Sequence, residues 1–204
     1  MPNKDTYRTI SNPSEEILFK EKKSKFYGYA FPISSVEEVK PIIDSLKKRH
    51  HTANHVCYAW QLGTKELRYR ANDDGEPNNS AGIPIYGQIQ SYQVTNVLIA
   101  VARVFGGTKL GVGGLISAYR TAAQLSLDSA DIIEETIKES LNIAFDYPDM
   151  DKVMRLIKQQ QLEVLEQKLE IQCEMVVAVP LSKLSFVISN FDSLVNVIVK
   201  KTTV

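Results

Sequence analysis

The chain has 204 residues, of which 44% are hydrophobic, so it can bury one large core or two small ones and is neither disordered nor fibrous. Its formal net charge is zero, which by itself argues against a dedicated nucleic-acid binder. It has two cysteines, no apolar signal-peptide core near Met1 and no run of about 18 apolar residues, so we expect a cytoplasmic protein with reduced thiols and no membrane partner.

The first part of the chain, residues 1–133, mixes strand and helix patterns. Ser35 is suited to cap a helix whose apolar positions extend to Leu46, and Pro41 should kink this helix or delay its start. The expected strands cover residues 17–19, 26–33, 56–62, 67–70 and 97–105, and a short helix is expected over residues 83–89.

Two histidines and a cysteine lie around the start of one of these strands. His55 and Cys57 share one face of the strand, but a nucleophilic pair would also need an orienting group and an oxyanion hole, and neither is identifiable. His51 and His55 could bind zinc together only on a helix, and the intervening residues form a turn. We therefore favour a buried cysteine beside a hydrogen-bonded histidine and assign no catalytic residue, metal or cofactor.

An acidic loop follows the strand near Arg70. Asp73, Asp74 and Glu76 place three carboxylates within four residues, where they could hold a hard cation or face a basic partner group. The same residues are also ordinary turn chemistry, and the spacing of a calcium loop is absent. We expect no metal here.

A glycine-rich loop, residues 105–114, contains five of the ten glycines of the chain. It joins an apolar strand to a segment with helical periodicity, so its backbone amides can face an anion, to which Lys109 would add a positive charge. It matches neither the Walker loop nor the dinucleotide pattern. The alternative is that the glycines only make a tight bend and permit close packing.

Arg103 stands at the end of the apolar strand, immediately before this loop. It could pair with Asp73 or Asp74, or it could face an anion, and the paired interpretation is the simpler one. The candidate ligand- or anion-binding residues are Arg103, Gly106, Gly107, Lys109, Gly111, Gly113, Gly114 and Arg120.

The last seventy residues have the clearest pattern. Strands are expected at residues 141–147, 162–169, 171–179 and 195–199, with helices over residues 150–157 and 181–191. This βαββαβ order is that of a ferredoxin-like domain.

We therefore expect two α+β domains, residues 1–133 and 134–204, with a linker at the acidic residues 134–139. Residues 1–133 carry 16 Lys and Arg against 13 Asp and Glu, and residues 134–204 carry 8 against 11, so the two parts have net charges of +3 and −3. A polyanion should prefer the first part.

Three ordered motifs resemble the Impact family in its bacterial, YigZ-like form. They are the His-x-Cys-x-Ala run at 55–59, the Asp-Asp-Gly-Glu-Pro run at 73–77 with Ala-Gly-x-Pro-Ile at 81–85, and residues 105–115 with Ala118 and Tyr119. The resemblance covers the first two thirds of the chain. It implies a ribosomal protein S5 domain 2-like domain, followed by a small ferredoxin-like domain, the two being similar to domains IV and V of elongation factor G. It also implies a role in translation or RNA binding, because eukaryotic members regulate translation.

The sequence departs from this family pattern at two positions. Val104 stands where a Tyr is usual, and Ser117 stands where an Arg normally precedes Ala-Tyr. Arg120 lies three residues further along the same side of a helix and can supply the missing charge.

These observations favour a binding protein over an enzyme, since no nucleophile, base and orienting group come together. Its expected partners are the ribosome or other structured RNA, or a translation-associated protein, reached through the glycine-rich loop. Two alternatives stay open: a small-molecule enzyme with a phosphate-binding pocket, and a pure protein-interaction adaptor.

Overall fold

The computed structural model describes residues 5–202 and divides the chain into two compact units. One unit is Tyr7–Glu135, and the other is built mainly from Thr136–Val204. Both units mix helices with antiparallel sheets, which confirms the predicted α+β class. No helix within residues 5–202 combines the length and apolarity that crossing a bilayer requires.

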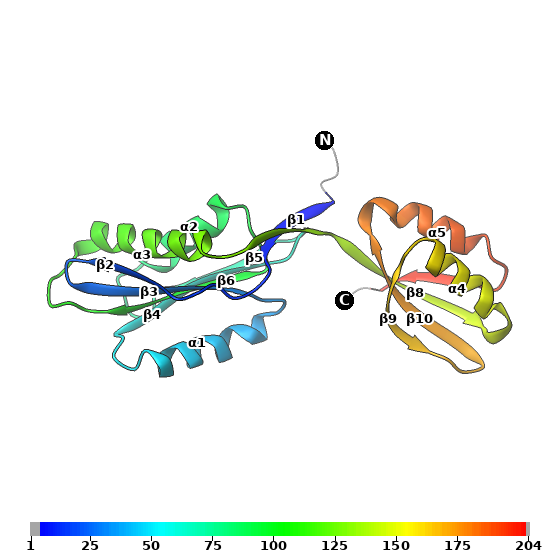
Figure 1. The fold of residues 1–204 in the computed structure, drawn as a ribbon, viewed down its shortest axis with the longest axis horizontal. Coiled ribbons are helices and arrows are strands. Elements are labelled where there is room, and N and C mark those ends of the chain that lie inside the picture. The colour runs from blue at the N-terminus through cyan, green and yellow to red at the C-terminus, as the bar shows by residue number, and fades with distance from the viewer. Residues whose placement is uncertain (1–4, 203–204) are drawn as a thin grey trace. The chain divides into compact units, whose positions relative to one another are not determined.

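The N-terminal unit is built on one antiparallel sheet with the strand order β2-β3-β6-β4-β5. Helix α1 covers one face of this sheet, and helices α2 and α3 cover the other (Figure 1). The strands are β2 (Ile17–Glu21), β3 (Ser24–Pro32), β4 (His55–Leu62), β5 (Arg68–Asn72) and β6 (Val97–Val104), and the helices are α1 (Val39–Arg49), α2 (Gly82–Ser91) and α3 (Gly111–Asp128).

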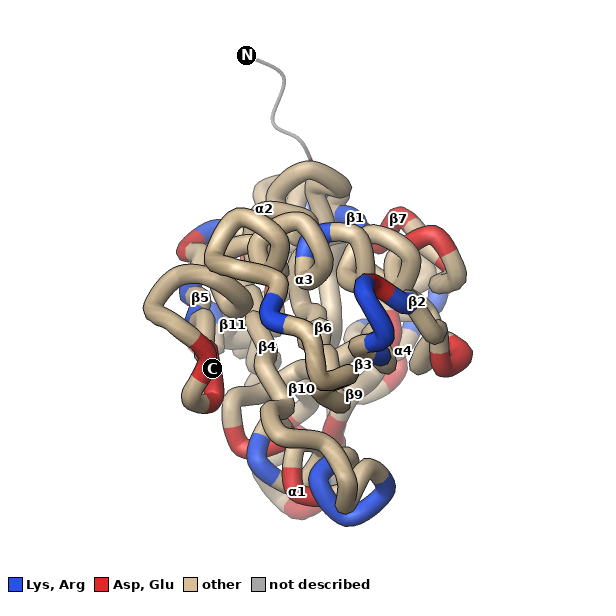
Figure 2. The backbone as a smooth tube through the Cα atoms, turned by 90° about the vertical axis from the view of Figure 1, so that its left-hand side faces the viewer, with Lys and Arg blue, Asp and Glu red and all other residues tan. Residues whose placement is uncertain are grey.

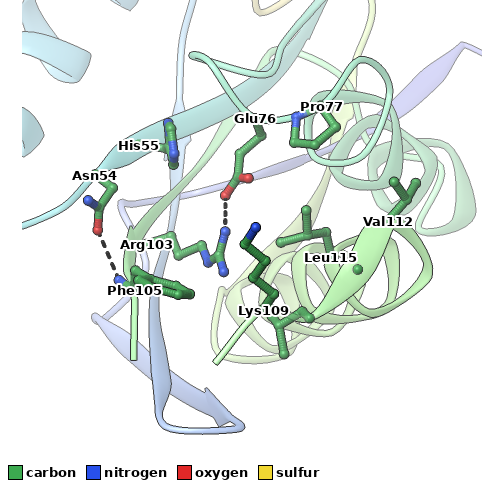
Figure 3. A pocket seen from close by; sticks show the side chains of 11 residues that line it. Asn54, His55, Glu76, Pro77, Arg103, Phe105, Lys109, Val112 and Leu115 are labelled. Atoms are coloured by element: carbon green, nitrogen blue, oxygen red, sulfur yellow. Dashed lines mark hydrogen bonds and ion pairs between the residues drawn. The ribbon is translucent and has the colours of Figure 1, made fainter. Parts of the chain in front are cut away.

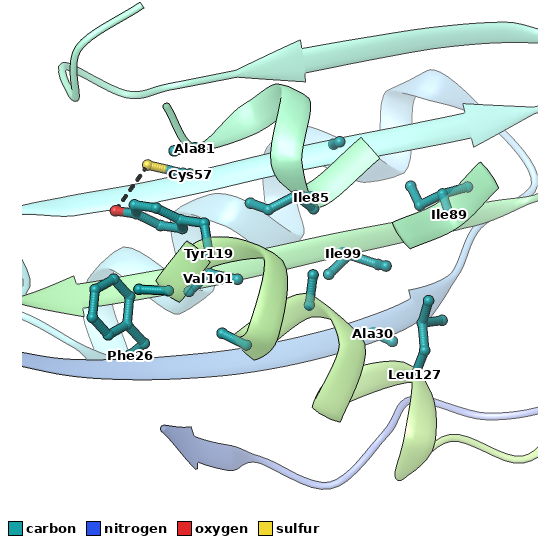
Figure 4. Close-up of a cluster of buried hydrophobic side chains, with 14 of the residues drawn as sticks. Phe26, Ala30, Cys57, Ala81, Ile85, Ile89, Ile99, Val101, Tyr119 and Leu127 are labelled. Carbon is teal, nitrogen blue, oxygen red and sulfur yellow. Dashed lines mark hydrogen bonds between the residues drawn. The ribbon is translucent and has the colours of Figure 1, made fainter. Parts of the chain in front are cut away.

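The central strand β6 separates two hydrophobic cores. Val97, Ile99 and Val101 belong to the core under α2 and α3, and the alternate residues belong to the core under α1. The first core also contains Cys57 and Tyr119 (Figure 4). Because side chains alternate along a strand, Arg103 continues the row that faces α3.

The start of α1 follows the sequence expectation. Ser35 and Glu38 form a capping box around a single 3-10 turn, η1 (Val36–Glu38), and the α-helix itself begins at Val39. Pro41 therefore lies in the first helical turn, where its missing N–H removes no intrahelical bond.

The acidic stretch at residues 134–139 connects the two units where a linker was expected, but most of it forms strands. Strand β7 (Ile132–Thr136) covers its first part and pairs with β1 (Thr6–Ile10), and strand β8 (Lys138–Asp146) covers the rest. Glu134 and Glu135 of β7 are exposed to solvent, so their charges are compatible with a strand in this small sheet. The structure divides the chain between Glu135 and Thr136.

The second unit has the predicted ferredoxin-like order. Its antiparallel sheet runs β11-β8-β10-β9, and α4 (Met150–Gln159) and α5 (Leu184–Asp192) pack their buried residues against it. Its further elements are η2 (Tyr147–Asp149), β9 (Glu163–Lys168), β10 (Gln172–Pro180), η3 (Leu181–Lys183) and β11 (Ile198–Lys201).

Candidate functional site

The acidic loop and the glycine-rich loop meet at one cleft of about 420 Å³ in the N-terminal unit (Figure 3). Glu76 and Pro77 come from the acidic loop, whereas Phe105 and residues 109–112 come from the glycine-rich loop and the start of α3. The remaining lining residues are Asn54, His55, Arg103 and Leu115. Because His55 and Arg103 are cross-strand partners on β4 and β6, the sheet itself positions both side chains.

Arg103 forms a buried ion pair with Glu76, not with Asp73 or Asp74. Its Nη1 lies 2.6 Å from Glu76 Oε1, and the two side chains are only 8% and 3% exposed. The Tyr119 hydroxyl donates a second hydrogen bond to the same carboxylate oxygen, at 2.8 Å. Arg103 Nε has no acceptor among the residues that the structure describes. The pair therefore joins β6, α3 and the acidic loop.

Asp73 and Asp74 organise the acidic loop and do not line the cleft. The Asp73 carboxylate accepts the backbone N–H groups of Asn79, Ala81 and Gly82 at 2.8–3.0 Å, which holds the chain at the start of α2. The Asp74 carboxylate accepts from the backbone N–H of Val56 and pairs with Lys47. Within residues 5–202 no group of three His, Cys, Asp or Glu side chains is placed to hold a metal ion.

His55 and Cys57 each hydrogen-bond to the acidic loop and form no nucleophilic pair. His55 Nδ1 lies 2.7 Å from the Asp74 carbonyl oxygen, which can only accept, so Nδ1 donates and Nε2 of the neutral ring is an acceptor. Cys57 is fully buried, with its Sγ 3.0 Å from the Asp73 carbonyl oxygen and 3.3 Å from Tyr119 Oη (Figure 4). Burial raises the pKa of the Cys57 thiol and that of the Tyr119 hydroxyl well above their ordinary values. Neither group is ready to ionise at neutral pH.

The first turn of α3 has no intramolecular cap. Leu110 is the N-cap residue, it makes no side-chain hydrogen bond, and no acidic residue follows in the first turn. An α-helix leaves its first N–H groups without intrahelical acceptors, and its macrodipole places positive charge there. Lys109 is exposed, lines the cleft, and has no ion-pair or hydrogen-bond partner among residues 5–202. This end of the cleft can therefore hold an anion.

The five glycines of the loop serve different purposes. A Cβ atom at Gly106 would lie 2.0 Å from the carbonyl carbon of Lys23, so close packing requires this glycine. Gly107 and Gly111 have φ values of +85° and +74°, which glycine adopts most easily. A Cβ atom at Gly114 would lie 3.1 Å from the Leu110 side chain. Only Gly113 has neither a positive φ nor a neighbour within 4 Å, so folding gives no reason for it.

The turn between β2 and β3 lies against the glycine-rich loop, and we did not expect it near the site. Lys22 and Lys23 form this turn with φ values of 44° and 67°, and Gly106 N–H donates to Ser24 Oγ at 3.2 Å. Figure 2 shows the Lys and Arg positions at this end of the N-terminal unit. The sequence shows a cluster of lysines at residues 20–25, but nothing in it indicates that they lie beside the glycine-rich loop. The lack of a side chain at Gly106 lets the backbone of this turn pack against the loop.

The structure thus brings together four of the candidate residues, namely Glu76, Arg103, Lys109 and Gly111. Arg120 is exposed on α3 and does not line the cleft. The lining residues that the sequence did not single out as ligand contacts are Asn54, His55, Pro77, Phe105, Leu110, Val112 and Leu115. These are mostly apolar, and they line the cleft because strand ends and a helix start converge there.

Comparisons by sequence and by structure both find known proteins that are similar to this chain. The sequence profile of the Impact N-terminal domain matches residues 22–127. The chain is 30% identical over 161 residues to IMPACT family member YvyE of Bacillus subtilis, covering 79% of this chain and 74% of the relative. It is 27% identical over 166 residues to IMPACT family member YigZ of Escherichia coli, covering 80% and 81%. A crystal structure of a hypothetical protein has the same fold, with a TM-score of 0.75 at 23% identity over 98% of both chains.

Proposed function

The chain belongs to the Impact family. We propose that it is a binding protein that acts in translation. Its N-terminal domain would contact the phosphate backbone of ribosomal or other structured RNA. The resemblance to this family implies the link to translation, and the glycine-rich loop would make the contact. The proposed place of action is the cytoplasm, where translation takes place.

One observation carries the proposal: Lys109 and the uncapped first turn of α3 lie at the same end of the cleft, and neither has a partner among the described residues. Unpaired backbone N–H groups and a mobile ammonium group are the donors that commonly bind phosphate oxygens. Such contacts fix the position of a nucleic acid without reading its bases. The open space next to Gly113 supports this proposal, because it lets another backbone approach closely.

Arg103 has a different proposed role. Since Glu76 balances its charge inside the protein, Arg103 would shape the cleft, whereas Lys109 would supply the net positive charge. Lys22 and Lys23 would extend the contact along the RNA, because their turn packs against Gly106. Arg120 would contribute only through long-range attraction.

The cleft also fits a second candidate function, the binding of a small phosphorylated molecule. The observation in its favour is the position of His55, whose Nε2 is an acceptor beside two cationic side chains. An enzyme would need a nucleophile or a second proton-transfer group at the same place. The buried thiol of Cys57 and the hydroxyl of Tyr119 do not meet that need, because both stay neutral.

Copurification from lysate tests the proposal if RNA and proteins are identified separately. We expect structured RNA to be recovered with the wild-type chain and with Lys183→Ala, in which an exposed lysine of the other unit is removed. Lys109→Ala should recover clearly less RNA. Recovery of a protein partner that resists ribonuclease, with no RNA in any sample, would contradict the proposal and favour an adaptor.

A further inference from the structure

We infer that the cleft holds one unpaired nucleotide of an RNA strand, with its base against Phe105 and its phosphate at Lys109 and the first turn of α3. The inference rests on the proposed RNA contact and adds which part of the RNA enters the protein. A phosphate group alone would leave most of the cleft empty, since a volume of about 420 Å³ is within the range of about 300–1,000 Å³ that organic ligands occupy.

Phe105 is an exposed aromatic ring held in a fixed position. Its residue is 43% exposed, and the Arg103 guanidinium lies over the ring at 5.6 Å from the centroid. Its backbone N–H donates to Asn54 Oδ1 at 3.0 Å, so the main chain at this residue is also fixed (Figure 3). Bases of single-stranded RNA stack on such rings, and an ordered ring loses little entropy when a base arrives.

Polar groups beside Phe105 suit the edge of a base. Asn54 uses its oxygen for the Phe105 N–H, and its amide nitrogen has no acceptor within residues 5–202, so it can donate. His55 Nε2 is an acceptor in the neutral ring, because Nδ1 donates to Asp74. The cleft thus offers one donor and one acceptor from adjacent residues. An unpaired base exposes the complementary groups on its Watson–Crick edge.

The phosphate end of the cleft has two independent features. The first is the uncapped start of α3 with Lys109 beside it. The second is Arg103, which lines the cleft with a side chain that is 8% exposed. Figure 3 shows Arg103, Glu76 and Lys109 turned toward one another. Since Glu76 engages only one nitrogen of the guanidinium, a phosphate can compete for the remaining donors.

Val112 and Leu115 form an apolar wall of the cleft at the start of α3. Val112 is 53% exposed, so its side chain is accessible to a ligand. A duplex keeps its bases stacked inside, where neither this wall nor Phe105 can reach them. The cleft should therefore distinguish single-stranded from double-stranded RNA.

The test compares a short unstructured RNA oligonucleotide with a duplex of the same length, using the full chain. Phe105→Leu keeps an apolar side chain and removes the ring, and Phe186→Leu is the matched control at another exposed phenylalanine. We expect Phe105→Leu to weaken single-strand binding by about tenfold while duplex binding and the salt dependence of both stay unchanged. Phe105→Trp should restore single-strand binding, and the fluorescence of the single, buried Trp60 reports that each variant with leucine is folded.

The other outcomes separate this inference from the proposed function. Equal binding of both RNAs, with no effect of Phe105→Leu, would overturn the inference and leave the proposed backbone contact standing. Failure of both RNAs to bind even at low salt would overturn both. A free nucleoside monophosphate that binds as tightly as the oligonucleotide would overturn the RNA strand as the source of the nucleotide.

Discussion

The acidic loop and the glycine-rich loop line the same cleft, yet they differ in how fully the protein itself uses their polar groups. In the acidic loop the carboxylates of Asp73, Asp74 and Glu76 all have partners within the chain. In the glycine-rich loop Lys109 and the first turn of α3 have none among the described residues. The difference teaches that charge alone does not mark a binding site, because a charged group whose partners are internal is part of the fold.

The largest expected effect is a loss of stability when an internal partner in the acidic loop is removed. Glu76→Ala leaves Arg103 buried without a counter-ion, so we expect a loss of about 3–5 kcal/mol in the free energy of unfolding, measured with urea at neutral pH. Lys109→Ala is the control from the other loop, and it should change that free energy by less than about 0.5 kcal/mol. Similar losses in both variants would remove the distinction between the loops.

A smaller loss is expected at Asp73. Asp73→Ala removes three hydrogen bonds from backbone N–H groups at the start of α2, which should lower the free energy of unfolding by about 2 kcal/mol. Asp73→Asn keeps one side-chain oxygen and should lose less. Thermal unfolding of the two variants checks this order, and an unchanged Asp73→Ala protein would show that the loop does not depend on the carboxylate.

Two glycines sharpen the comparison within the glycine-rich loop. Gly106→Ala forces a Cβ against the Lys23 backbone and should destabilise the domain by about 1 kcal/mol or more. Gly113→Ala meets open space and should stabilise it by about 0.5 kcal/mol, since alanine is the better helix former. If Gly113 serves an approaching backbone, the same variant should bind RNA less well. A stabilised Gly113→Ala protein with unchanged RNA affinity would contradict that role.

The smallest expected effect concerns Cys57. Because burial raises the pKa of its thiol, Cys57 should react very slowly with iodoacetamide near pH 8, although it should react readily in urea. In the unfolded chain the thiol ionises near its ordinary pKa of about 8.5, so its contribution to stability is present below that pH and is lost as the pH rises above it. Peptide mapping by mass spectrometry checks the labelling. Fast native labelling of Cys57 would support a reactive group behind the acidic loop.

The sequence predicted local features well, because short-range signals determine them. Ser35 as a helix cap and the alternation in the last seventy residues both led to the correct elements. The pairing of β1 with β7 was missed because it joins segments more than 120 residues apart, and nothing in the acidic stretch at residues 134–139 indicates a partner. Non-local pairing of this kind is decided by tertiary structure.

The sequence pointed to the two loops that line the cleft, but not to the contacts within it. The glycine content pointed to the loop, but it did not tell which glycines pack and which are exposed. The sequence led us to expect Asp73 or Asp74 as the partner of Arg103, but the partner is Glu76, because three carboxylates within four residues cannot be told apart by spacing alone. The approach of Lys22 and Lys23 to Gly106 depends on a hairpin 82 residues away along the chain, which no spacing rule could supply.

The salt dependence of RNA binding tests the central claim most directly. For a contact between Lys109 and a phosphate, the slope of log K against log salt for a structured RNA should fall in magnitude by about one unit in Lys109→Ala. Lys183→Ala, from the other unit, should keep the wild-type slope. Identical slopes for the wild type and Lys109→Ala, both folded, would contradict the account.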